Sequence, residues 1–542
     1  MALQVHQEIA AAELPASPPA SDANRTLTYS TIAVMLATLL SMVLGFGREV
    51  VNAQYFGERW ELDAFLVAAI IPTLVFGIFN GALVSALVPI FSGYFAAGKP
   101  EEAWRFSSTV INGLIIVLSL CAVVAWLAAP FLVHVVAKGF PGPEAGVTTR
   151  MTRILIPTIV ATSIAGVLQA LLNSQRSYRA AALQGAALNI CTIIGVLILF
   201  RLYGIYALVF GTAVGLFAQL FIQLPNYLRR CKYRFVIDLH HPGLKALALI
   251  LGPIIVGSAV GQVNLLFDKY FASILEPGNI AAMQYATKVV GFPQQLFAAA
   301  IATVIFPVLA AQFASNEPRS LRATALSGLR MTALITIPAA FALIALARPI
   351  ISVLFERGEF TPGDVVRTAG AMQFYAVGLL GLAASIVLTR CFFAMHDSKT
   401  PVLIATAVVI LNVACSALTF RTFGINGLAA SNSLSSLVEA AVLAWLFTRR
   451  LGAIDGDQLR PSFASTLTAS AIMAAVAWAI STSLWRVSAP FWQHATILLA
   501  AILSGVIVFI AAGALLRIPE MGTLWSLLSA RVTGRPNSIA QV

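Results

Sequence analysis

Charge is scarce in this chain. Only 10% of its 542 residues are charged and 59% are hydrophobic, whereas an ordinary soluble domain has roughly 25% charged residues. A soluble chain of this length needs more polar surface to cover its core. The composition therefore excludes a soluble enzyme, a disordered protein and a nucleic-acid-binding module, and no nucleic acid is expected among its partners.

Short alternating segments are also missing. The strands of a membrane barrel alternate polar and apolar residues over about 10 residues. The apolar runs here continue for about 18 residues or more, which is the length that crosses a bilayer as a helix. The predicted fold class is therefore an all-α polytopic membrane protein.

Cysteines and nucleotide-binding motifs are equally sparse. The five cysteines form no CxxC pair, so neither a disulfide framework nor a zinc site is indicated. No GxxxxGK[ST] loop is present, which argues against direct ATP hydrolysis. The longest expected external loop, 138–150, offers one acid, Glu144, too little for a glycosyltransferase or ligase site. The sequence predicts a transporter without a cofactor rather than an enzyme.

Fourteen membrane spans are expected from the apolar runs. The Ala-, Pro- and Ser-rich start lacks the basic and apolar regions of a cleaved signal peptide, so the first span is expected to direct insertion. Several spans contain prolines, which bend helices where a neighbour or a watery cavity can bind the freed carbonyl. The expected limits are 29–50, 62–95, 106–137, 151–174, 181–200, 204–228, 245–274, 279–312, 323–347, 365–393, 401–420, 424–448, 462–485 and 491–516.

The basic residues suggest the orientation. The net charge is +12, and its simplest explanation is that Lys and Arg gather in cytoplasmic loops. With both termini in the cytoplasm, cytoplasmic segments hold roughly twice as many Lys and Arg residues as external ones. The densest basic loop, 229–245, then lies inside.

An internal repeat is visible at a spacing of 220 residues. Arg201–Ile205 (RLYGI) matches Arg421–Ile425 (RTFGI), and Arg229–Arg230 matches Arg449–Arg450. The spacing covers six spans, and an even number preserves orientation, so the repeats are parallel, as in transporters whose substrate lies between two lobes.

This duplication divides the chain into five expected parts. They are a cytoplasmic tail (1–27), an N-terminal lobe of six spans (28–230), a C-terminal lobe of six spans (231–450), two extra spans (451–518) and a cytoplasmic C-terminal tail (519–542).

Ionisable residues within the spans are the first site candidates, because each costs roughly 2.5–3.5 kcal/mol near the bilayer centre. Arg48 and Asp63 flank a short external turn. They form either a charged pair at the mouth of a cavity or an interfacial salt bridge that closes a hairpin. Lys288 lies inside an apolar span before Pro293 and suits phosphate binding; the alternative is a lysine that reaches the external interface.

Other polar groups are candidates for supporting roles. Asp268 and Lys269 are adjacent, so they point about 100° apart on a helix. Glu439 either binds a cation or proton, or hydrogen-bonds the serines of 431–436 across helices. Candidates for gating or other roles are Glu49, Glu439, Pro72 and Pro293.

An ordered set of short motifs resembles the MurJ (formerly MviN) lipid II flippase family of the multidrug/oligosaccharidyl-lipid/polysaccharide exporter superfamily. The resemblance extends over about residues 28–515. The matching stretches are Leu44–Glu49, Phe56–Gly57, Asp63–Phe65, Pro72, Val88–Ile90, Phe292–Pro293, Phe306–Pro307, Leu354–Thr361, Tyr375–Leu379 and Ala394–Pro401.

The resemblance implies a fourteen-helix fold with two six-helix lobes around a cationic cavity and a polyprenyl-tail groove formed by the last two helices. It implies a bacterial inner-membrane protein of peptidoglycan biosynthesis. Such a protein flips undecaprenyl-diphosphate-linked disaccharide-pentapeptide, lipid II, from the inner to the outer leaflet by alternating access. Its other expected contacts are membrane lipids, and we expect a monomer.

The resemblance also assigns residues. Arg48 and Asp63 match charged residues that the family needs, and Lys288 stands where the family usually has arginine. Asp268 falls at a position associated in some members with a sodium ion. Asn412 matches another ligand of that ion, and Ser416 stands where an aspartate is expected.

Departures from the family pattern keep other substrates open. Met42, Ile70 and Phe76 stand where the family often has basic residues, and Thr287 replaces an acidic residue. A flippase for another polyprenyl-linked oligosaccharide is therefore an alternative. A cation-coupled drug antiporter is a second one, since it would use Asp268 and Glu439. Transport is driven either by the membrane potential or by sodium or protons through Asp268.

Overall fold

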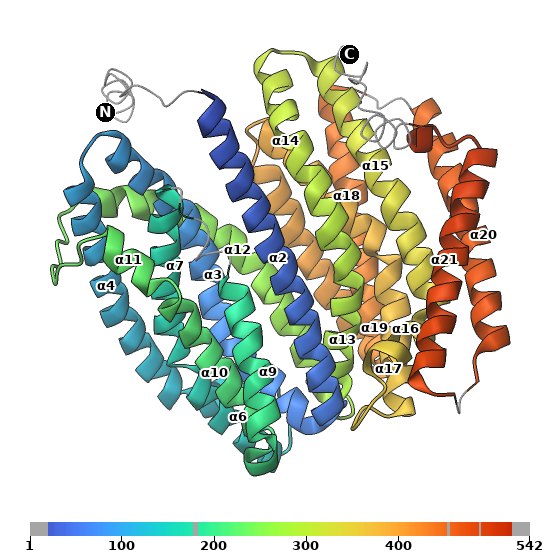
Figure 1. Cartoon of the computed structure of the whole chain (residues 1–542), viewed down its shortest axis with the longest axis horizontal. Helices are drawn as coiled ribbons and strands as arrows, with labels where there is room; N and C mark the ends of the chain where they lie inside the picture. The colour runs from blue at the N-terminus through green and yellow to red at the C-terminus, as the bar shows by residue number, and fades with distance from the viewer. Residues whose placement is uncertain (1–19, 176, 178–182, 453–455, 487–488, 523–542) are drawn as a thin grey trace. The chain divides into compact units, whose positions relative to one another are not determined.

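The computed structural model describes residues 20–175, 177, 183–452, 456–486 and 489–522 (Figure 1). Within these ranges the regular elements are helices and no strand is present, so the all-α prediction is confirmed. The chain divides into two compact units, Met1–Gly278 (unit 1) and Asn279–Val542 (unit 2).

The described helices of unit 1 run from α2 to α12. Their bounds are α2 Ala20–Phe56, α3 Trp60–Ala96, α4 Pro100–Leu127, α5 Ala129–Val136, α6 Gly142–Leu155, α7 Thr158–Ser174, α9 Gln184–Tyr203, α10 Tyr206–Phe221, α11 Leu224–Arg230 and α12 Pro242–Ile274.

The described helices of unit 2 run from α13 to α21. Their bounds are α13 Asn279–Pro293, the π-helix η1 Gln294–Ala298, α14 Ala299–Ala314, α15 Pro318–Ala345, α16 Ala347–Phe355, α17 Pro362–Val377, α18 Leu379–Ala394, α19 Lys399–Leu451, α20 Gly456–Leu484 and α21 Phe491–Leu515.

The helices match the expected spans. In the described ranges ten helical stretches, some of them made of two or three consecutive helices, are long and apolar enough to cross a membrane, and the pair α17 and α18, bent by 42°, brings the number to 11. Helix α19 contains a break at Gly424 (φ 56°, ψ −137°) and so holds two of the expected spans. Within the described ranges each expected span falls on helix, which is consistent with fourteen.

Close backbone approach holds helices together in unit 1. A Cβ added to Gly195 of α9 would lie 2.6 Å from the Cα of Gly211 in α10, so only glycine fits there. Small residues at such crossings are the usual way for membrane helices to pack.

Unit 2 uses the same device together with hydrogen bonds. A Cβ on Gly381 of α18 would lie 2.7 Å from the backbone of Ser436 and Leu437 in α19. One turn away, the Ser433 hydroxyl donates to the carbonyl of Phe374 (2.6 Å) and accepts from the Gly378 N–H (3.1 Å). These bonds satisfy backbone groups at the bend between α17 and α18, which a membrane otherwise leaves without water.

The unit boundary differs from the repeat-based lobe boundary, because α12 belongs to unit 1. The five-part division, which follows an internal duplication, stays a prediction. At the start of the expected C-terminal tail, Glu520 is buried and bonds to Arg330 and to the Ser462 hydroxyl (2.9 Å). Most of both expected tails lies outside the described residues.

Candidate functional site

Arg48 and Glu49 form an ion pair on α2. The Arg48 Nη2 lies 2.8 Å from Glu49 Oε1, with 21% of the arginine side chain exposed and Glu49 buried. Asn52 Nδ2 contacts the other Glu49 oxygen at 3.5 Å. The sequence predicted a role for each charge but not their pairing. The pair allows Arg48 to stay charged in an apolar helix, because its neighbour compensates the charge.

Asp63 lies in the first turn of α3, where a negative charge is favoured by the helix dipole. It is only 2% exposed, and its Oδ2 accepts the Gly278 N–H at 2.6 Å. Gly278 has φ +93°, a conformation that favours glycine. Asp63 therefore fixes the turn that follows α12. This is a positioning role that neither of the two readings from the sequence anticipated.

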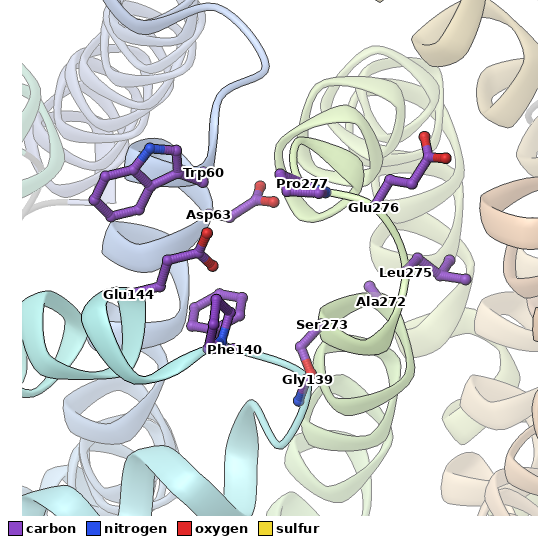
Figure 2. A pocket seen from close by; sticks show the side chains of 11 residues that line it. Trp60, Asp63, Gly139, Phe140, Glu144, Ala272, Ser273, Leu275, Glu276 and Pro277 are labelled. Carbon is purple, nitrogen blue, oxygen red and sulfur yellow. The ribbon is translucent and has the colours of Figure 1, made fainter.

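A pocket of about 240 Å³ adjoins Asp63 in unit 1. Figure 2 shows Trp60 and Phe140 on its walls, with the carboxylates of Asp63 and Glu144 directed into it and Glu276 directed away. The lining holds three acidic side chains, two of them directed into the pocket, and no basic one, so it repels a phosphate. This pocket is therefore unsuited to the diphosphate of a lipid-linked sugar.

The loop before α6 approaches α12 closely at this pocket. A Cβ on Gly139 would lie 2.0 Å from the Ser273 carbonyl oxygen, and the Gly139 N–H points to Ser273 Oγ at 3.4 Å. This contact was not predicted from the sequence. The glycine- and proline-rich stretch at residues 139–143 was the available signal.

Lys288 lies on α13 in unit 2, and its surroundings fit a ligand-binding group. The opposite side of the helix is buried through residues such as Ala286 and Val290, whereas Lys288 is exposed. Among the described residues it has neither a hydrogen bond nor an ion pair. Gln284, Thr287 and Lys288 are spaced three and four residues apart and are at least partly exposed, so they share one polar face.

The polar face of α13 leads into an irregular turn. Pro293 ends α13, and the π-helix Gln294–Ala298 follows directly. Proline lacks the N–H that would continue the α-helical bonding, and π-helical turns occur frequently at functional sites.

In unit 1, Pro72 is buried within the continuous helix α3. Beside it the Thr73 hydroxyl donates to the Ala69 carbonyl at 2.6 Å.

The residues expected to bind a cation are divided between the units. Asp268 and Lys269 are both buried in α12 of unit 1, so neither reaches the interface. Asn412 and Ser416 lie one turn apart in α19 and are 2% and 1% exposed. The Ser416 hydroxyl has no hydrogen-bond partner among the described residues. A sodium site stays a prediction.

Glu439 is half-buried in the second part of α19. In the described part of the chain it has no hydrogen bond or ion pair. Of the serines expected to bind it, Ser431 donates to Gly427 (2.8 Å), Ser433 to Phe374 (2.6 Å) and Ser436 to Asn432 (2.9 Å), and the Ser435 hydroxyl has no hydrogen-bond partner among the described residues. Its carboxyl group is thus left available for a proton or cation.

The turn before α19 carries a stabilised carboxylate. Burial alone would raise the pKa of Asp397, but hydrogen bonds from the Thr400 hydroxyl (2.6 Å) and N–H (3.0 Å) and the contact with Arg450 lower it to about 2. Asp397 is therefore ionised at neutral pH and joins the start of α19 to its end.

Comparison with known proteins decides the family. The model of the family described as lipid II flippase MurJ matches residues 52–512. The chain belongs to the lipid II flippase MurJ family. The lipid II flippase MurJ of Burkholderia cenocepacia is 30% identical over 421 residues, covering 75% of this chain and 81% of that protein. The probable lipid II flippase MurJ of Vibrio cholerae is 29% identical over 439 residues, covering 78% and 82%.

Solved structures agree on the fold. The lipid II flippase MurJ in an inward closed conformation has a TM-score of 0.77 at 24% identity and covers 90% of this chain and all of that one. A multidrug resistance transporter of the MATE family in an inward-facing conformation has a TM-score of 0.67 at 15% identity, covering 78% and 99%. The fold of this chain is thus shared with a MurJ flippase and with a MATE-family transporter.

Proposed function

We propose that this chain flips lipid II, the undecaprenyl-diphosphate-linked disaccharide-pentapeptide, from the inner to the outer leaflet of the bacterial inner membrane by alternating access. Membership of the MurJ family carries the assignment. Lys288 supports it, because it is exposed on α13 and has neither a hydrogen bond nor an ion pair among the described residues, and a lysine is a point charge that suits a diphosphate. The chain then acts as a transporter and catalyses no covalent step.

The test is complementation. The wild-type chain is expressed in a bacterium depleted of its own lipid II flippase, and membrane insertion is confirmed by immunoblot. We expect growth to be restored. Lys288→Ala should abolish rescue at equal insertion, whereas Lys288→Arg should retain it. Lys138→Ala is the matched control, because Lys138 is exposed in the loop between α5 and α6.

Each outcome is informative. Rescue by Lys288→Ala would remove this lysine from the mechanism while leaving lipid II as the substrate. Failure of a well-inserted wild-type chain would instead favour the second candidate, a flippase for another polyprenyl-linked oligosaccharide. That candidate is motivated by positions at which this chain lacks the basic residue that the family often has. One of them is Ile70, which is buried and apolar.

The driving force is proposed to be either the membrane potential or a cation. Moving an anionic headgroup outward gains about 2.3 kcal/mol per charge per 100 mV from an inside-negative potential. Glu439 and Asp268 are the candidates for proton or sodium coupling. Transport in vesicles with an imposed potential but no sodium or proton gradient distinguishes the two. Glu439→Gln should slow transport only if that carboxyl group is coupled.

A further inference from the structure

The connection between α11 and α12, residues 231–241, is not helical: residues 231–238 form no regular element, and a turn follows at residues 239–240. Every second side chain along it is apolar and exposed: Tyr233 44%, Phe235 83%, Ile237 42% and Leu239 74%. In an extended chain, alternate side chains share one face. The segment therefore presents a continuous apolar row, and exposed rows of this kind mark interaction sites.

The opposite face of the segment is fixed to α4 by hydrogen bonds. The Arg234 N–H donates to Ser108 Oγ at 3.1 Å, and Asn112 Nδ2 donates to the Val236 carbonyl at 3.0 Å. The Tyr233 hydroxyl donates to Asn112 Oδ1 at 2.6 Å. Polar groups of α4 are thereby covered. Tyr233 reaches α4 through its hydroxyl, whereas Phe235, Ile237 and Leu239 are exposed and make up the part of the apolar row that faces away from α4.

Further hydrogen bonds and ion pairs hold the segment in the same register against α4. The Asp238 N–H donates to Thr109 Oγ1 at 3.3 Å, and the Asp238 carboxylate lies 2.9 Å from Arg105 Nη2. Glu101 accepts from Lys232 at 3.1 Å. A slip by one residue would turn the apolar row inward and lose these bonds.

Both ends of the segment are anchored. Cys231 is buried beside Gln175. His241 is buried and stacks on Phe106 with ring centroids 5.2 Å apart, while its Nδ1 accepts the N–H of Gly243 at the start of α12. The exposed row is therefore held on a rigid support, and α12 starts where it ends.

Basic residues flank the apolar row at the level where the membrane begins. Arg229, Arg230 and Lys245 are exposed and form no ion pair within the described ranges. Arg230 ends one candidate span, and Pro242 begins the next apolar helix. Apolar side chains beside unpaired basic groups at this level are complementary to a leaflet with anionic headgroups.

We propose that residues 231–241 are a membrane-interface anchor. Phe235 and Leu239 insert into the leaflet on this side, which is the cytoplasmic one in the predicted orientation. Arg229, Arg230 and Lys245 bind the phosphates of anionic phospholipids there. The anchor ties the start of α12 and the face of α4 to one leaflet, and it does not depend on which lipid-linked sugar is transported.

The experiment measures fluorescence quenching by lipids. The five native cysteines are replaced, and Phe235→Cys, Leu239→Cys and, as the control, Ala97→Cys are labelled with bimane. Ala97 is exposed in the turn between α3 and α4, next to the end of α4 that binds the segment. The full-length chain is reconstituted in vesicles containing either brominated phosphatidylglycerol or brominated phosphatidylcholine in otherwise identical mixtures.

We expect quenching at 235 and 239 but not at 97, and stronger quenching by the anionic lipid. Replacing Arg229, Arg230 and Lys245 with glutamine should lower the anionic preference at least about fivefold, while quenching by the neutral lipid persists. Absence of quenching at 235 and 239, or equal quenching at 97, would overturn the insertion. Equal quenching by both lipids would overturn the choice of an anionic lipid.

Discussion

Asp63 offers the sharpest test of how unit 1 is held together. Its carboxylate is buried and accepts the Gly278 N–H at 2.6 Å. Asp63→Ala would leave that N–H without its acceptor, and a lost charge-assisted bond of this kind costs about 1.5–3 kcal/mol. Asp63→Asn keeps an oxygen acceptor and removes the charge, so the expected cost is about 1 kcal/mol.

The assay pairs stability with transport. Thermal unfolding of the detergent-solubilised chain should rank wild type, Asp63→Asn and Asp63→Ala in decreasing order of midpoint. Glu144→Gln is the matched control, because Glu144 lines the same pocket and should leave the midpoint nearly unchanged. If transport requires the charge itself, Asp63→Asn will fail complementation although it remains folded.

Two results would contradict these expectations. If Asp63→Ala unfolds at the wild-type temperature, the bond to Gly278 does not stabilise the turn after α12. If Asp63→Asn is both stable and fully active, the charge of Asp63 is needed neither for folding nor for transport.

Three further predictions concern packing and pH. Ser433→Ala should destabilise the chain by about 1–2 kcal/mol, because it loses hydrogen bonds to another helix. Ser436→Ala loses a bond within its own helix and should have almost no effect. Equal unfolding midpoints of the two variants would contradict this prediction. Because the pKa of Asp397 is lowered to about 2, its stabilisation is complete above pH ~4 and is lost as the pH falls through 2. Wild type should therefore lose about 1 kcal/mol more than Asp397→Asn between pH 5 and pH 2, after allowance for solvent screening, and parallel acid-unfolding curves would exclude the contribution. Gly195→Leu should reduce the yield of folded protein severely, because its side chain overlaps backbone of the neighbouring helix; a normal gel-filtration profile would contradict the packing.

Much of the fold follows from the sequence, because the bilayer allows few alternatives. A chain in lipid must satisfy its backbone polar groups internally, so long apolar runs predict helices, and within the described ranges each expected span lies on helix. The sequence also predicted two separate spans, 401–420 and 424–448, where the structure has α19. Gly424, in the repeated RTFGI motif, adopts a positive φ and breaks this helix. Family membership was predicted from short ordered motifs and is shown by the match over residues 52–512.

The roles of individual charges were less accessible to sequence reasoning. Sequence placed Arg48, Asp63 and Lys288 within or beside spans but could not say which were compensated. Arg48 is paired with Glu49, and Asp63 holds the Gly278 turn. Lys288 alone of the three is exposed with no partner in the described part of the chain.

The sequence alone determined the membrane class and the helical fold through its composition and apolar runs, and the family through short ordered motifs. Tertiary structure alone decided which polar groups are satisfied, because a hydrogen bond depends on distances between residues far apart in the chain. Asp63 and Gly278 are 215 residues apart, and Asn112 and Val236 are 124 apart. The exposed apolar row in residues 231–241 likewise required the tertiary structure. The alternation of apolar and polar residues in the sequence does not reveal which side of the segment is covered, and the structure shows that its polar groups bind α4.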